Sequence, residues 1–116
     1  MKKGFRTDKR YLEDIQLSMQ RIAEYIEGYD FNRFKKDHKT VDAVIRNFEI
    51  IGEASKNLSE EIKIQNPNIP WHEMYYLRNR VTHEYFGIDY EIIWDITINY
   101  LPDNKVLVDQ IIDKLR

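Results

Sequence analysis

The apolar residues of this chain recur at intervals of three and four, and this spacing limits the possible folds more than any other feature. An α-helix turns about 100° per residue, so such spacing gathers apolar side chains on one face. No segment shows the sustained alternation between turns that is typical of half-buried strands. The sequence therefore predicts an all-α fold, an up-and-down bundle of four to five main helices plus short ones.

The first half of the chain is expected to hold two long helices and two short ones. The first long helix, residues 8–28, would be capped by Thr7 or Asp8 and ended by Gly28. A short turn is expected at residues 31–36, a long helix at 40–58, and a brief helix after Ser59. Gly52 would allow a neighbouring element to approach closely. The apolar stripe of the first helix is Leu12, Ile15, Met19, Ile22 and Ile26.

Three further helices are expected in the second half. One begins near Pro70 and ends at Gly87, and Asp89 would cap the next, over residues 90–100. Pro102 would open the last helix as a separate element. Its inward residues are expected to be Val106, Val108, Ile111, Ile112 and Leu115.

Length and composition indicate one domain, residues 1–116. The absence of cysteine excludes disulfides and thiolate chemistry, and His38 and His72 lack partners at metal-ligand spacing, so no metal or cofactor is expected. The net charge of -2 means that any nucleic-acid contact is a local patch. No apolar run is long enough to cross a bilayer, and a cytoplasmic protein without membrane contact is expected.

The segment from Arg78 to Tyr85 carries the chemistry. Arginine presents a planar fork of donors that suits a phosphate, and histidine exchanges protons near neutral pH. Together Arg78 and His83 could cleave RNA without a metal, with His83 as general base or general acid and Arg78 stabilising the developing charge. A 2′,3′-cyclic phosphate is the expected product end.

A straight helix would not bring this pair together. Arg78 and His83 would lie about 140° apart around the axis and about 7.5 Å apart along it. Either the helix distorts near its end, or two chains complete the site as a homodimer. Ile50, outside the main apolar stripe, and the aromatic surface of Tyr75 and Tyr76 also favour a dimer. His83 in a last helical turn would favour the acid role.

The chain resembles the HEPN superfamily and, within it, the HepT-like toxins, whose motif is Arg, four residues, His, one residue, Tyr. Arg78, His83 and Tyr85 match it, and the resemblance covers roughly residues 8–102. It implies a helical homodimer and a ribonuclease toxin, with Arg78 and His83 catalytic and Asn79 supporting them. Position 84 is often Gly in relatives, whereas this chain has Glu84, whose carboxylate could hold His83 protonated or partly repel RNA.

The resemblance also implies a type VII-like toxin–antitoxin system. Its partner would be an MntA-type minimal nucleotidyltransferase antitoxin that attaches AMP to Tyr85, whose added bulk and negative charge would repel an RNA phosphate.

Asn47, Glu53 and Arg80 are further candidates to line the groove, although a solvated or paired carboxylate is the simpler interpretation of Glu53. The basic cluster of Arg33, Lys35, Lys36 and Lys39 is a candidate RNA patch or an ordinary solvated turn. The alternative function is a non-catalytic helical subunit that binds nucleotide or substrate for a partner nucleotidyltransferase.

Overall fold

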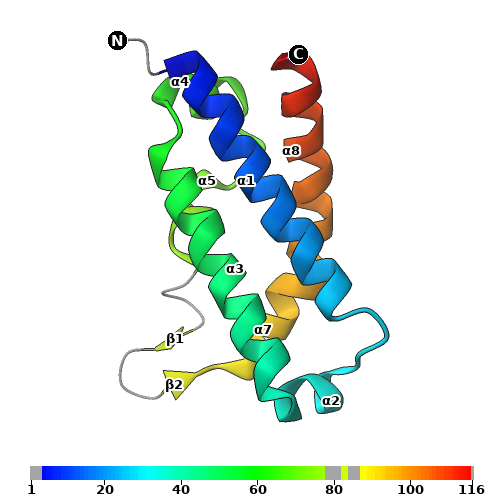
Figure 1. Cartoon of the computed structure of the whole chain (residues 1–116). Coiled ribbons are helices and arrows are strands. Elements are labelled where there is room, and N and C mark those ends of the chain that lie inside the picture. Colours follow the sequence, from blue (N-terminus) through cyan, green and yellow to red (C-terminus); the bar gives the residue numbers. More distant parts are fainter. Residues whose placement is uncertain (1–3, 78–81, 84–86, 116) are drawn as a thin grey trace.

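The computed structural model describes residues 4–77, 82–83 and 87–115, with side chains from residues 8–77 and 87–115. Its longest helices are α1 (Gly4–Tyr25), α3 (His38–Asn57) and α8 (Leu101–Leu115), and α1 packs along both α3 and α8. Figure 1 shows α1 running opposite to its two neighbours, with both chain ends at the same end of the molecule. The all-α bundle is confirmed.

Short helices complete this bundle, with α4 at its upper end and α2 at its lower end in Figure 1. They are α2 (Phe31–Lys36), α4 (Glu60–Gln65), α5 (Trp71–Tyr75) and α7 (Tyr90–Asp95). Side-chain caps fix several of the starts: Ser59 Oγ accepts from the backbone N–H of Ile62, and Asp89 Oδ1 accepts from that of Ile92. Both caps were expected from the sequence.

One apolar core runs between α1, α3, α5, α7 and α8. Its fully buried side chains include most of the predicted stripes, and Gln16 Nε2 donates to Asp109 Oδ1 at 2.7 Å to join α1 to α8 at its edge. None of the described helices combines the length and apolarity needed to cross a membrane. The largest residues with under 2% exposure are Phe34, Phe48, Leu12, Ile15, Ile22, Ile51, Ile93 and Ile112.

The start of α1 differs from the prediction. The helix begins at Gly4, so Asp8 lies within it and does not cap it. The Asp8 side chain is buried, and its carboxylate accepts hydrogen bonds from the backbone N–H and the hydroxyl of Ser59. An acid that the local sequence marks as a cap therefore binds the cap residue of another helix, α4.

The predicted break before Pro102 is also wrong. A π-helical turn, η1 (Ile96–Tyr100), joins α7 directly to α8, and the Leu101 N–H donates to the Ile96 carbonyl. Proline lacks an N–H and its ring clashes with the carbonyl four residues before it, and a widened turn accommodates both. Val106, expected to face inward, is 54% exposed.

The helix predicted from Pro70 to Gly87 is the largest error. Helix α5 ends at Tyr75, and two short strands follow, β1 (Thr82–His83) and β2 (Gly87–Ile88). They pair antiparallel, with Thr82 opposite Ile88 and His83 opposite Gly87. The β-branched residues Thr82 and Ile88 favour extended backbone, and Gly87 adopts a φ of 80° that other residues rarely take.

Candidate functional site

Of the motif residues, the structure describes only His83, and only its backbone. His83 lies in β1, while Arg78, Asn79, Arg80 and Tyr85 lie outside the described residues. The angle of about 140° between Arg78 and His83 assumed one straight helix, so it does not apply to this hairpin. His83 lies in a strand and not in the last turn of a helix, so the predicted stabilisation of its imidazolium by a helix end is wrong.

Helix α5 leads directly to Arg78 and is held firmly against α3. A Cβ atom added at Gly52 of α3 would lie 2.9 Å from the carbonyl oxygen of Tyr75, so the two backbones are in close contact. Trp71 Nε1 donates to the Asn66 carbonyl at 2.9 Å, and Met74 is 2% exposed. The approach that was expected at Gly52 is confirmed, and it fixes the chain just before the motif.

Three aromatic rings form an exposed cluster on α5 and the residue after it. The ring of Tyr76 lies 4.8 Å from that of His72 and 4.5 Å from that of Tyr75, measured between centroids. Tyr75 and Tyr76 are each 39% exposed. Exposed rings of this kind can stack on nucleic-acid bases. We call this group the aromatic cluster; it ends two residues before Arg78 in the sequence.

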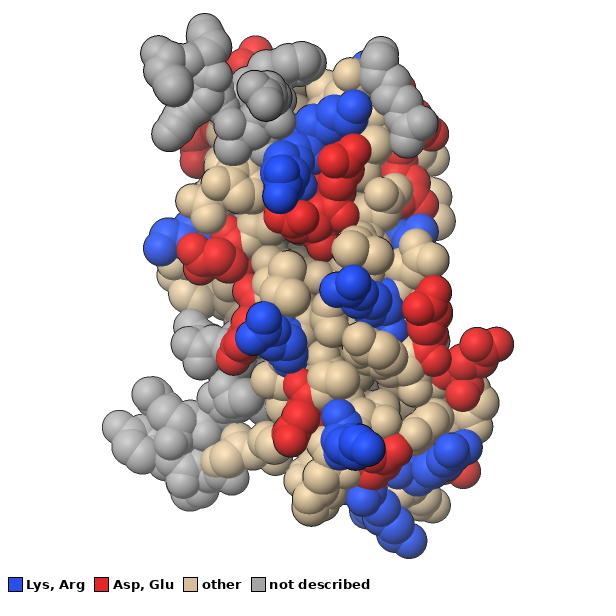
Figure 2. Space-filling view, viewed as in Figure 1, with Lys and Arg blue, Asp and Glu red and all other residues tan. Residues whose placement is uncertain are grey.

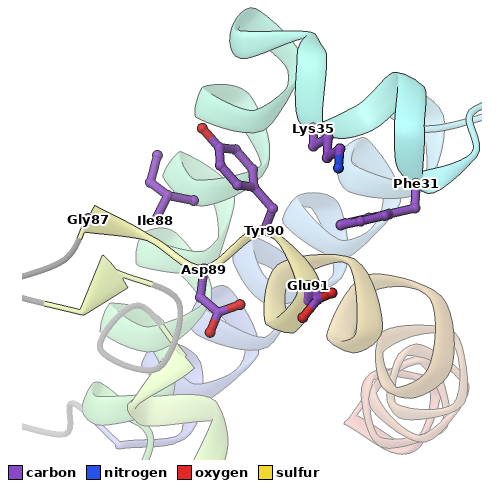
Figure 3. A pocket seen from close by; sticks show the side chains of 7 residues that line it. All are labelled: Phe31, Lys35, Gly87, Ile88, Asp89, Tyr90 and Glu91. Atoms are coloured by element: carbon purple, nitrogen blue, oxygen red, sulfur yellow. The ribbon is translucent and has the colours of Figure 1, made fainter.

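A cleft begins where the motif ends. It has a volume of about 400 Å³ and lies between α2 and the segment formed by β2 and the start of α7. Figure 3 shows Lys35 and Phe31 entering from α2, with Tyr90 between them and β2. We call it the α2–α7 cleft. The residues that line it are Phe31, Lys35, Gly87, Ile88, Asp89, Tyr90 and Glu91.

The basic cluster lies at this same end of the molecule. Arg33, Lys35, Lys36 and Lys39 are all exposed on α2 and the first turn of α3. Figure 2 shows several Lys and Arg side chains at the lower end, where α2 lies in Figure 1. The guanidinium of Arg33 lies 4.0 Å from the centroid of the Tyr29 ring. The cluster is therefore partly ordered by aromatic contacts.

Asp37, which dilutes this positive charge, holds the corner between α2 and α3. The hydroxyl of Tyr29 donates to its carboxylate, as do the backbone N–H and the hydroxyl of Thr40. These bonds, with that of Tyr29 foremost, lower the pKa of Asp37 from its ordinary value of 3.8 to about 2. The carboxylate is thus a charged structural group at neutral pH.

Comparison with known proteins identifies the family. The sequence pattern described as "Ribonuclease HepT-like" matches residues 15–111, which include the whole motif. The chain belongs to the HepT-like ribonuclease family. This membership confirms the resemblance to the HEPN superfamily and the expected enzyme class, an endoribonuclease.

Relatives of the HepT-like family align over most of their length. A Methanocaldococcus jannaschii protein named "Putative RNase" is 45% identical over 104 residues, covering 90% of this chain and 86% of that protein. A Thermococcus cleftensis protein named "Probable ribonuclease HepT" is 43% identical over 100 residues, covering 86% and 91%. No solved structure matches the chain.

Two candidate groove residues of this HepT-like chain lie on different sides of α3. Asn47 is 4% exposed and donates through Nδ2 to the Ala43 carbonyl, whereas Glu53 is exposed. Six residues along a helix correspond to a separation of about 120° around its axis. Within the described part of the chain, Asn47 Oδ1 is buried without a hydrogen-bond partner. The described residues do not bring these two side chains to one surface.

Sequence reasoning missed the α2–α7 cleft. It included Lys35 only as a member of a basic cluster and Asp89 only as a helix cap. Nothing in the local pattern links α2 to residues that follow the motif, because their contact depends on how α2 packs against α7. The sequence feature of this HepT-like chain that could have indicated a ligand site at α2 was Phe31, an aromatic residue next to a run of cations.

Proposed function

We propose that the chain is a metal-independent endoribonuclease that cleaves RNA with Arg78 and His83. The observation that carries this proposal is the family match over residues 15–111, which contains Arg78, His83 and Tyr85 at the motif spacing. An arginine fork can stabilise a phosphorane-like charge, and an imidazole can move a proton near neutral pH.

The reaction needs no group from outside the protein and the RNA. The ribose 2′-oxygen attacks the adjacent phosphorus, its proton is removed, and the bond from phosphorus to the 5′-oxygen breaks as that oxygen gains a proton. The products are a 2′,3′-cyclic phosphate and a 5′-hydroxyl. His83 performs one of the two proton transfers, and Arg78 stabilises the charge on the phosphoryl oxygens. Asn79 is proposed to support the site.

Features on both sides of the motif support an RNA substrate. The aromatic cluster precedes Arg78, and Lys35 of α2 lines the same cleft as the strand that follows His83. Single-stranded RNA is bound by cations along its backbone and by rings that stack on its bases. Arg80 is proposed as a further groove residue, together with either Asn47 or Glu53, since α3 does not bring those two side chains to one surface.

The direct test is RNA cleavage by Arg78→Ala and His83→Ala. Each substitution is expected to lower the rate by roughly 10²-fold or more, because proton transfer and charge stabilisation each contribute at that scale. Arg46→Ala and His38→Ala remove exposed residues of the same types on α3 and are expected to retain the parent rate. If His83→Ala cleaves as fast as its parent, the catalytic role of His83 is wrong. If the parent protein itself cleaves no RNA but binds ATP or the transferase tightly, the chain is better explained as a non-catalytic, nucleotide-binding subunit.

We also propose that the working form is a homodimer in which each groove uses both motifs. The exposed rings of Tyr75 and Tyr76 supply aromatic surface beside the motif. Mixing Arg78→Ala protein with His83→Ala protein tests this idea. A shared groove predicts partial recovery of cleavage in the mixture, since some mixed dimers keep one intact site. A sedimentation measurement showing only monomers at micromolar concentration contradicts the dimer.

Regulation by adenylylation forms the last part of the proposal. An MntA-type nucleotidyltransferase antitoxin in the cytoplasm would attach AMP to Tyr85, two residues from His83, and the added charge would exclude RNA. Intact-mass measurement with ATP and the transferase should show one or more AMP increments. An increment that persists at full occupancy in Tyr85→Phe assigns the modification to another residue.

A further inference from the structure

The α2–α7 cleft begins beside the motif histidine. His83 of β1 pairs with Gly87 of β2, and Gly87 is a lining residue of the cleft. The Cα atoms of directly paired antiparallel residues lie about 4.5–5.5 Å apart. The end of the cleft at Gly87 therefore lies next to the backbone of His83.

The walls of the cleft differ in charge. Lys35 projects from α2 with its amine 5.2 Å from the centroid of the Phe31 ring, and no carboxylate pairs with it within the described residues. Asp89 and Glu91 line the opposite side, and Figure 3 shows the carboxylate of Asp89 pointing away from Lys35. Asp89 is already engaged as the cap of α7. Glu91 is exposed and lies beyond that cap.

This combination suits a ligand with three chemical parts. An ammonium group binds a phosphate, an aromatic ring stacks on a base, and a carboxylate accepts hydrogen bonds from hydroxyl groups. A volume of about 400 Å³ lies within the range of small-molecule sites. A ribonucleotide unit carries all three parts, and its 2′-hydroxyl distinguishes it from a deoxyribonucleotide.

We propose that the α2–α7 cleft is a subsite for one ribonucleotide unit, with Lys35 at the phosphate, Phe31 at the base and Glu91 at the ribose hydroxyls. The biological role of this subsite rests on the proposed function. The ribonucleotide unit would belong to the RNA strand and lie on the His83 side of the bond that is cleaved. An AMP group on Tyr85 has the same chemistry and is the other possible source.

Binding of AMP to the unmodified chain tests the subsite without any cleavage. Lys35→Ala is expected to weaken AMP binding about tenfold, because one charge-assisted hydrogen bond is lost. The matched control is Lys36→Ala, which removes an exposed neighbour on α2 that does not line the cleft and should change binding less than about twofold. Adenosine, which lacks the phosphate, should bind both variants equally.

A second comparison examines the ribose. AMP should bind more tightly than 2′-deoxy-AMP, and Glu91→Gln should reduce that preference. Equal losses in Lys35→Ala and Lys36→Ala overturn the subsite, as does AMP binding that Lys35→Ala leaves unchanged. These results do not depend on cleavage, so they are distinguishable from a failure of His83→Ala to lose activity.

Kinetics then separate the two sources of the nucleotide. If RNA occupies the cleft, Lys35→Ala raises KM for RNA in the unmodified protein and leaves kcat nearly unchanged. If the AMP group on Tyr85 occupies it, Lys35→Ala leaves KM unchanged and restores cleavage to the adenylylated protein. If Lys35→Ala produces neither effect, the cleft has no part in either interaction and the proposal is wrong.

Discussion

The carboxylate of Asp8 in α1 accepts hydrogen bonds from the backbone N–H of Ser59 at 2.9 Å and from its hydroxyl at 2.6 Å. The two residues are 51 positions apart, and Ser59 also caps α4. One buried acid therefore ties the start of α1 to the turn between α3 and α4. We expect this tie to contribute more to stability than any exposed ion pair of the described residues.

Asp8→Asn should lower the free energy of unfolding by about 1–3 kcal/mol. The amide of Asn has one oxygen acceptor and one NH₂ donor, so its NH₂ group would face one of the two Ser59 donors and that hydrogen bond would be lost. Urea unfolding at neutral pH measures the change. Asp14→Asn alters a less buried acid on the same helix and should change stability by less than about 0.5 kcal/mol. Equal effects of both substitutions would contradict the role assigned to Asp8.

Gly52→Ala should destabilise the chain by about 1–3 kcal/mol, because the new methyl group would meet the backbone oxygen of Tyr75. The same displacement should lower RNA cleavage, since α5 leads to Arg78. Thermal unfolding and a cleavage assay on one preparation test both effects. Lys56→Ala on the exposed side of α3 is the control, and a Gly52→Ala protein as stable as its parent would show that α5 shifts freely.

Tyr29→Phe should raise the pKa of Asp37 from about 2 toward 3.8, because the phenol supplies the main hydrogen bond to that carboxylate. A lowered pKa stabilises the folded state fully above pH 3.8, and this contribution is lost as the pH falls toward 2. The difference in unfolding free energy between Tyr29→Phe and its parent should therefore shrink as the pH falls from 3.8 toward 2. Carboxyl-carbon NMR of Asp37 measures the pKa, and Tyr25→Phe should leave it unchanged.

Asn47→Leu should change the free energy of unfolding by less than about 1.5 kcal/mol, because it removes a buried oxygen that has no partner among the described residues. Asn57→Leu is a close control, since Asn57 makes the same bond to the carbonyl four residues back but is exposed. A loss of several kcal/mol in Asn47→Leu alone would reveal a partner for Oδ1. Cleavage by the same variant tests its proposed place in the groove.

The helices could be predicted from sequence where their signals are local. Ser59 and Asp89 cap the helices that follow them, and the apolar stripe of α1 faces the core. Capping acts over three residues and helical periodicity over one or two turns, so both are visible in a short stretch of sequence. The close approach at Gly52 could be predicted because close contact between backbones favours the residue without a side chain.

Other features depend on packing between distant segments. The partner of Asp8 lies 51 residues away, and the hairpin of Thr82–His83 with Gly87–Ile88 replaces a helix that the apolar spacing favoured. Arg78 and His83 were identified from the motif spacing alone. Lys35 and Glu91 were not linked to them, because only the packing of α2 against α7 brings their side chains to one cleft.

The π-helical turn at Ile96–Tyr100 allows two residues five positions apart, Ile96 and Leu101, to be buried and to line the same pocket beside Leu77. In a regular α-helix they would lie about 140° apart. Such a turn is equivalent to one extra residue in an otherwise regular helix. A variant with one residue deleted within this turn could keep the helical segments on both sides packed against the core. Evolution or design could therefore change the length of the helix here without reorienting the side chains of α7 and α8.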